Sequence, residues 1–323
     1  MSTSFEGTRF GRLVTLLALA FCAVFFAPIP NAGVRKLEAR WWRSDARVFV
    51  TGNSVVDHAS RCDGDKRTIP EMLSGVTGLP VANLSAGGQR MDESVGLAAQ
   101  LLHRHSTDAV VFLVSLFAFH DRHAFDLRTQ LFFRLAAGPL HSTSLVERFA
   151  AGTWDGPAIQ PEMGPYRYKD KDYPDYNQVK TEYLSREQRL MGCPEQLGVD
   201  RAFVEANYWN DYLRAPLVPA NVDDVAALGG IADENQKRLV VVLMPIDLED
   251  VRTLSPEIST QIREHAVSVA DALRAKGVPL LDLSEALPAD RFADRWCACG
   301  HLLQEARLDV ATRVAAALAA PRD

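Results

Sequence analysis

Two unbroken apolar runs constrain the fold of this chain more than any other feature of its sequence. They cover residues 108–116 (DAVVFLVSL) and 238–245 (RLVVVLMP). A strand that is apolar at nearly every position needs cover on both faces, which is typical of the middle of a parallel sheet. The first run is therefore predicted to lie in the middle of a parallel sheet, and the second is predicted to be a further strand.

Shorter strands and helices alternate around these two runs. Further strands are predicted at 47–51, in the stretch from 79 that ends in a glycine-rich turn, and at 278–283. Helical spacing of apolar residues appears between the strands, over 68–77, 91–103 and 256–275 and in an alanine-rich segment that runs to about 319. Strand alternating with helix is the pattern of βαβ units, so the sequence predicts an α/β fold with a mainly parallel sheet.

The N-terminus carries an uncharged apolar run, residues 13–29, which Arg9 and Arg12 precede. A helix of about 17 residues measures about 26 Å, just enough to cross a bilayer. The arginines favour a cytoplasmic N-terminus and an exported body. A cleaved signal peptide is the alternative, although Pro30 stands where a cleavage site needs a small residue. We expect a single-pass protein of the inner (cytoplasmic) membrane whose main domain lies in the periplasm or another extracytoplasmic space.

The composition indicates a globular chain, with 47% hydrophobic and 24% charged residues. A net charge of −6 leaves no basic footprint, so no nucleic acid is expected as a partner. The predicted organisation is a membrane anchor over 1–30, a linker over 31–46 and one domain over 47–320. A polar, tyrosine-rich insertion interrupts the α/β pattern at about 118–215.

Ser54 follows the first predicted strand on a glycine turn, residues 52–54 (Gly-Asn-Ser). Glycine suits such a turn because a tight reversal often needs a positive φ or close backbone approach. A serine held there can project its hydroxyl above the end of the sheet, which makes Ser54 a candidate nucleophile. An ordinary polar turn with a helix cap is the alternative.

A serine nucleophile needs a base, and the base needs a group that orients it. His301 stands at the start of the last predicted helix, and Asp294 lies in the loop before it. Sites in open α/β sheets form beyond the carboxyl ends of the strands, so both are expected near Ser54. Gly88, on the turn after the second strand, would offer its backbone N–H to a developing oxyanion.

These motifs, in this order, resemble those of the SGNH (GDSL-like) hydrolase superfamily. Residues 52–54 correspond to its Gly-Asp-Ser turn, with Asn53 in place of the aspartate. Residues 83–88 correspond to the block with the oxyanion glycine, and Asp294 with His301 to the Asp-x-x-His block before the last helix. The resemblance covers roughly residues 47–318 apart from the insertion. It implies a three-layer α/β/α sandwich around a five-stranded sheet.

The third block of the family is missing. Residues 115–118 (Ser-Leu-Phe-Ala) stand where the family has Gly-x-Asn-Asp. Loss of one oxyanion donor costs on the order of 10²–10³ in rate. Gln89 or His120 could substitute, so they join Gly88 and Asn53 as candidate oxyanion or substrate-binding residues.

The last block is longer than in the family, because Asp294 and His301 are seven residues apart instead of three. The difference resembles an insertion that contains Cys297 and Cys299. An exported domain permits disulfides. A bond from Cys62 to one of these two cysteines is therefore our hypothesis for what fixes the longer loop.

The membrane anchor and altered motifs resemble one subgroup of the superfamily, the acyl-transfer proteins of cell-envelope polymers, such as alginate O-acetylation proteins. The resemblance implies acyl transfer or ester hydrolysis of the O-acetyl kind through Ser54, on an extracytoplasmic polysaccharide or cell-envelope glycan. It also implies a membrane-bound O-acyltransferase partner and no cofactor. The alternative is a catalytically silent scaffold that binds the glycan or the acyltransferase. His120 and His123 lack the further ligands that a metal site needs, so none is predicted.

Overall fold

The computed structural model describes most of the predicted α/β domain. The described residues are 45–60, 63–85, 89, 91–120, 217–293 and 300–321, with isolated positions at 11, 14–17, 205, 208–209 and 211–213. Most of the predicted anchor and insertion lies outside them. Within the described residues, no helix is both long and apolar enough to cross a membrane.

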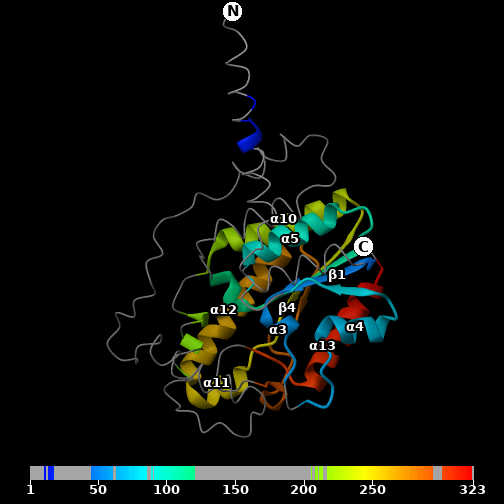
Figure 1. Ribbon diagram of the computed structural model, residues 1–323. Helices are drawn as coiled ribbons and strands as arrows, with labels where there is room; N and C mark the ends of the chain where they lie inside the picture. The colour runs from blue at the N-terminus through cyan, green and yellow to red at the C-terminus, as the bar shows by residue number, and fades with distance from the viewer. Residues whose placement is uncertain are drawn as a thin grey trace, which may run out of the picture.

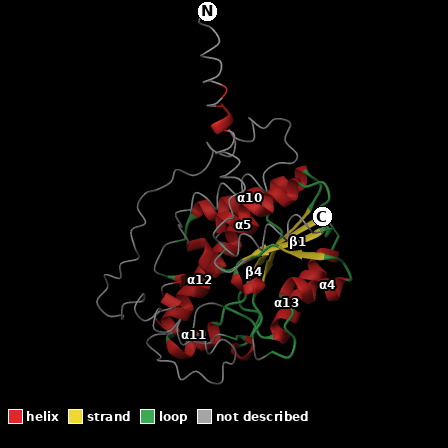
Figure 2. Cartoon of the chain, viewed as in Figure 1, coloured by secondary structure: helices red, strands yellow, loops and turns green. Residues whose placement is uncertain are grey.

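Five parallel strands form the sheet, shown in yellow in Figure 2. The strands are β1 (Val48–Gly52), β2 (Val81–Asn83), β3 (Ala109–Val114), β4 (Arg238–Leu243) and β5 (Leu280–Asp282). Their order is β2-β1-β3-β4-β5, and every neighbouring pair is parallel. The predicted α/β class and mainly parallel sheet are confirmed. β3 is buried at every position, as its apolar run predicted.

Helices cover both faces of the sheet, so the described part forms three layers (Figure 1). One face carries α5 (Met91–His103), α10 (Pro219–Glu234) and α12 (Pro256–Ala275), and we call it the α12 side. The other carries α4 (Ile69–Thr77) and α13 (Gln304–Ala319), and we call it the α13 side.

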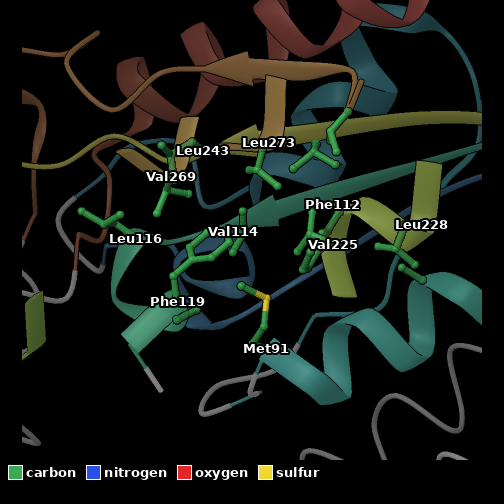
Figure 3. Packing of buried hydrophobic residues seen from close by; sticks show 14 of the residues in the cluster. Met91, Phe112, Val114, Leu116, Phe119, Val225, Leu228, Leu243, Val269 and Leu273 are labelled. Carbon is green, nitrogen blue, oxygen red and sulfur yellow. The ribbon is translucent and has the colours of Figure 1, made fainter. Parts of the chain in front are cut away.

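Successive residues of β3 supply the cores of the two sides in turn. Phe112 and Val114 belong to the core of the α12 side, whereas Val111 and Leu113 belong to that of the α13 side. Figure 3 shows the first of these cores, where Phe112 and Val114 pack with Val225 of α10 and other apolar residues. This alternation is the period of two that a strand imposes on its side chains.

Short helical segments follow three of the strands at their carboxyl ends. A one-turn helix, α3 (Ser54–Asp57), follows β1, and a 3₁₀ turn, η1 (Leu116–His120), follows β3. After β4 comes α11 (Leu248–Leu254), and a further 3₁₀ turn, η3 (Ala289–Arg291), precedes His301 in the chain. Ser54, His120 and His301, the described candidates that follow these strands, therefore lie at one edge of the sheet.

The helix α10 was missed by the sequence analysis. Its buried residues Val222, Val225 and Ala232 lie on one helical stripe, but Gly229 and Gly230 dilute the pattern. Pro219 at the helix start was a usable signal, since proline is favoured at the first helical position.

Candidate functional site

The turn that carries Ser54 packs closely against β3. Gly52 pairs with Leu113, and a Cβ added at Gly52 would lie 2.5 Å from the Leu113 carbonyl oxygen and 2.6 Å from Val56 Cγ2. Real Cβ atoms essentially never come that close. Of the two reasons for glycine that the sequence suggested, close backbone approach is therefore the one that applies here.

Asn53 fixes this turn from both sides. Its Oδ1 accepts a hydrogen bond from the Val55 N–H at 3.0 Å, which caps α3, and its Nδ2 donates to Ser115 Oγ at 3.0 Å. The cap of this helix is thus Asn53, and Ser54 is the first helical residue. Asn53 is a candidate oxyanion donor, but one of its two amide hydrogens is already bonded to Ser115, the residue after β3.

A second histidine brings His301 to the helix of Ser54. His58, the C-cap of α3, lies four residues after Ser54, and residues four apart share one face of a helix. The His58 ring contacts the His301 ring, with centroids 4.3 Å apart and planes tilted by 33°. The His301 imidazole therefore packs against the residue that ends α3, the helix that begins with Ser54. His301 is buried, whereas Ser54 and His58 are half-buried.

The backbone around His301 is held by the ends of two neighbouring segments. The Ala293 N–H donates to the His301 carbonyl at 2.7 Å, and Phe292 forms an antiparallel bridge with Leu302. Gly300 has a φ of 69° and lies beside the Pro245 carbonyl at the end of β4. Asp294, the predicted orienting residue, follows Ala293 in sequence and lies outside the described residues.

Arg307 on α13 ties the same segment to the loop that follows α3. This fully buried side chain donates from Nη1 to Asp63 Oδ2 at 2.6 Å and to the Leu302 carbonyl at 2.7 Å. Its Nε and Nη2 donate to the carbonyls of Arg67 and Asp65. A guanidinium suits this task because its five N–H donors form a rigid fork. Leu302, the residue after His301, is thus held by the same guanidinium that forms the buried ion pair with Asp63.

The last residue of α3 binds the segment before Gly88. Asn83 Nδ2 donates to Asp57 Oδ1 at 2.8 Å. Asn83 Oδ1 in turn accepts from the backbone N–H of Ser85 at 2.9 Å and from the Ser85 hydroxyl. Gly88, the predicted oxyanion glycine, lies outside the described residues, so its role stays a prediction.

Gln89, a candidate substitute for the missing oxyanion donor, is buried against the end of β1. Its Nε2 donates to Thr51 Oγ1 at 3.1 Å. One of its two amide hydrogens is therefore used within the protein, as in Asn53.

His120, the other candidate substitute, lies in a buried aromatic cluster on the α12 side. Its ring stacks on that of His265 of α12, with centroids 5.0 Å apart. Tyr212 packs next to them, since its carbonyl lies 3.2 Å from His265 Nδ1. Burial raises the pKa of Tyr212 well above its usual range, and the carboxylates of Asp211 and Asp247 add to the rise. These contacts do not place His120 beside Ser54.

The structure thus gathers Asn53, Ser54 and His301 around α3. Asp294, Gly88 and the three cysteines of the disulfide hypothesis lie outside the described residues, so those parts of the prediction stay untested. In the described part of the chain, no three His, Cys, Asp or Glu side chains gather closely enough to hold a metal ion.

Two residues of this region were missed by the sequence analysis. The spacing of four residues between Ser54 and His58 was a usable signal, because it places both on one helical face. Arg307 stands on the apolar stripe of α13 with Val310 and Val314, and a charge in such a stripe indicates a buried partner.

No protein-family model matches the chain, and no curated protein shows significant similarity to it. Solved structures to which the chain shows some similarity include LAE5, an alpha/beta hydrolase from the metagenome of Lake Arreo, Spain, at 10% identity and a TM-score of 0.39, covering 84% of this chain and 94% of that one. A mutant of Axe2, an acetyl-xylooligosaccharide esterase from Geobacillus stearothermophilus, also has 10% identity and a TM-score of 0.39, covering 87% and 98%. Similarity this weak carries no argument about activity.

Proposed function

We propose that this chain transfers or hydrolyses ester-linked acyl groups, of the O-acetyl kind, through Ser54. One observation carries the proposal: the His301 ring packs on His58, the cap of the helix that begins with Ser54, although Ser54 and His301 come from opposite ends of the domain. A serine activated by an imidazole is the pair that nucleophilic acyl transfer requires.

In the proposed reaction, Ser54 Oγ attacks the acyl carbonyl carbon while His301 takes the hydroxyl proton. The tetrahedral intermediate collapses when the ester oxygen leaves with the proton from His301, which yields acyl-Ser54 and the freed alcohol. Water or a sugar hydroxyl then attacks the acyl-serine and gives its proton to His301. The acyl group leaves as the free acid or the new sugar ester, and Ser54 Oγ takes that proton back from His301. Asp294 would orient His301, and the Gly88 N–H would bind the oxyanion.

The proposed substrate is an extracytoplasmic polysaccharide or another acylated cell-envelope glycan. The proposed location is the periplasmic face of the inner membrane, with residues 1–30 as the anchor and a membrane-bound O-acyltransferase as partner. The resemblance of the sequence motifs and the apolar N-terminal run support this part of the proposal.

A catalytically silent scaffold is the second candidate, and one observation favours it. Asn53 and Gln89, two amides near the serine turn, each donate a hydrogen bond to a protein hydroxyl, to Ser115 and Thr51 respectively. Amides that bind the protein itself are less available to stabilise an oxyanion. In this reading the domain binds the glycan or the acyltransferase without acyl transfer.

Turnover of an acetyl ester reporter by the full chain, purified in detergent, distinguishes the enzyme from the silent scaffold. We expect Ser54→Ala and His301→Gln to lower the rate by about 10³-fold or more. His103→Gln changes an exposed histidine on α5 and is the matched control, which should behave as wild type. Equal rates for Ser54→Ala and wild type would eliminate the enzymatic proposal. Adding an oligosaccharide acceptor and measuring its acetylation separates transfer from hydrolysis.

A further inference from the structure

The described contacts fix the backbone on both sides of the candidate histidine pair. Asp57, next to His58, accepts a hydrogen bond from Asn83 Nδ2 at 2.8 Å. At His58 the backbone turns out of the helix, with φ of −100° and ψ of 141°. On the opposite side, Ala293 and Arg307 bind the carbonyls of His301 and Leu302. Two rings on fixed backbones, 4.3 Å apart, limit each other's orientation.

We propose that His58 is a positioning residue for His301, an inference that rests on the proposed function. The flat face of the His58 ring holds the His301 imidazole in the orientation that reaches Ser54. It also lies against the positive charge that His301 gains when it takes the serine proton. An aromatic face within about 6 Å attracts a cation, so a neutral ring at position 58 favours this charged intermediate. A cation at the same position would oppose it.

Three substitutions at position 58 separate shape from charge. His58→Phe keeps a flat ring, His58→Gln keeps a polar group without a ring, and His58→Lys places a cation there. We expect kcat for the acetyl ester reporter to stay within about 3-fold of wild type in H58F, to fall about 10-fold in H58Q and about 100-fold in H58K. KM should change little, because the binding of the substrate is left intact. His103→Gln is the control for loss of an exposed histidine.

A spectroscopic measurement tests the contact without reference to activity. The His301 Cε1–H signal in the proton NMR spectrum is assigned by its loss in His301→Gln. In the wild type, the ring current of His58 displaces this signal. We expect His58→Gln to remove that displacement and His58→Phe to retain a ring-current effect, also in a Ser54→Ala background.

Two outcomes overturn the inference. Equal kcat for wild type and H58Q shows that His58 does not position the base, and so does a loss in H58F as large as that in H58Q. If the wild type shows no turnover that depends on Ser54, the proposed function fails first, and the positioning role in that reaction fails with it. The NMR signal then still decides whether the ring of His58 holds His301, since an unchanged signal in H58Q contradicts the contact.

Discussion

Two histidine pairs lie at the carboxyl edge of this sheet, on opposite faces. His58 and His301 contact each other on the α13 side, and His120 and His265 on the α12 side. In the sequence, His120 and His301 have comparable positions, since each follows a strand. The difference lies in the elements that carry the rings. The first pair includes a residue on the helix of Ser54, whereas the second packs among tyrosines.

The forces that hold the two pairs also differ. Directional polar bonds surround the first pair, from Asn83 to Asp57 and from Arg307 to Asp63 and Leu302. Ring packing adds to polar contacts around the second: Tyr212 contacts Tyr208 at 5.9 Å and Phe117 at 6.0 Å between centroids, and its carbonyl lies 3.2 Å from His265 Nδ1. The first pair thus lies beside a buried ion pair, whose charge-assisted bond is stronger than a neutral one.

The largest expected effect distinguishes the two pairs by activity. His301→Gln should lower kcat for the acetyl ester reporter by about 10⁴-fold, because the base is lost. His120→Gln should change it by less than about 10-fold, because its ring lies with His265 on the other side. A loss of roughly 10²–10³-fold in H120Q would instead support His120 as the substitute oxyanion donor that the sequence suggested.

The second prediction concerns the buried ion pair of the α13 side. Arg307→Met leaves Asp63 buried without its partner and should lower the free energy of unfolding by about 3–5 kcal/mol. Arg313→Met removes an exposed pair with Asp309 on the same helix and should cost less than about 0.5 kcal/mol. Denaturant unfolding monitored by circular dichroism measures both. A cost below about 1 kcal/mol for R307M would contradict the stabilising role that we assign to the bond between Arg307 and Asp63.

The third prediction tests the tight packing of the serine turn. Gly52→Ala puts a methyl group 2.5 Å from the Leu113 carbonyl oxygen and should cost about 1–3 kcal/mol of stability. Gly96→Ala on α5 meets nothing within 4 Å and should stabilise by about 0.5–1 kcal/mol. Thermal unfolding of the two variants should therefore shift in opposite directions. An unchanged thermal stability in Gly52→Ala would show that the turn can move away from β3.

The smallest expected effect is a pH dependence in the loop that Arg307 binds. The hydrogen bond from the Arg67 side chain lowers the pKa of Asp65 from 3.8 to about 2. A depressed folded-state pKa means that this contribution to stability is complete above about pH 4 and is lost as the pH falls towards about 2. Asp65→Asn and Arg67→Met should both weaken the acid dependence of unfolding in that window. An unchanged acid dependence in both variants would contradict the pairing.

Much of the fold could be predicted from the sequence, because its signals are local. The apolar run of β3 identified a central strand, and the predicted helix over 256–275 has the bounds of α12. The run that predicted β2 was less exact, since the strand is confined to Val81–Asn83. Helix α10 was not predicted, because two glycines weaken the apolar periodicity of its sequence.

Less of the candidate site could be predicted from the sequence, because its contacts join distant segments. Ser54 and His301 could be named from local motifs and from strand order. The contact between His58 and His301, and the bonds from Arg307 to Asp63, depend on how α3 meets the segment before α13. Local patterns could have marked His58 and Arg307 as unusual, but their partners follow only from the three-dimensional arrangement.

The central claim is that Ser54 accepts an acyl group with His301 as the base. Its most direct test is mass spectrometry of the full chain after brief exposure to an acetyl ester reporter and acid quenching. We predict one acetyl group on the peptide that contains Ser54 in the wild type, and no such adduct in Ser54→Ala or, on the same timescale, in His301→Gln. An unmodified Ser54 in the wild type, or equal acetylation in His301→Gln, would contradict the account.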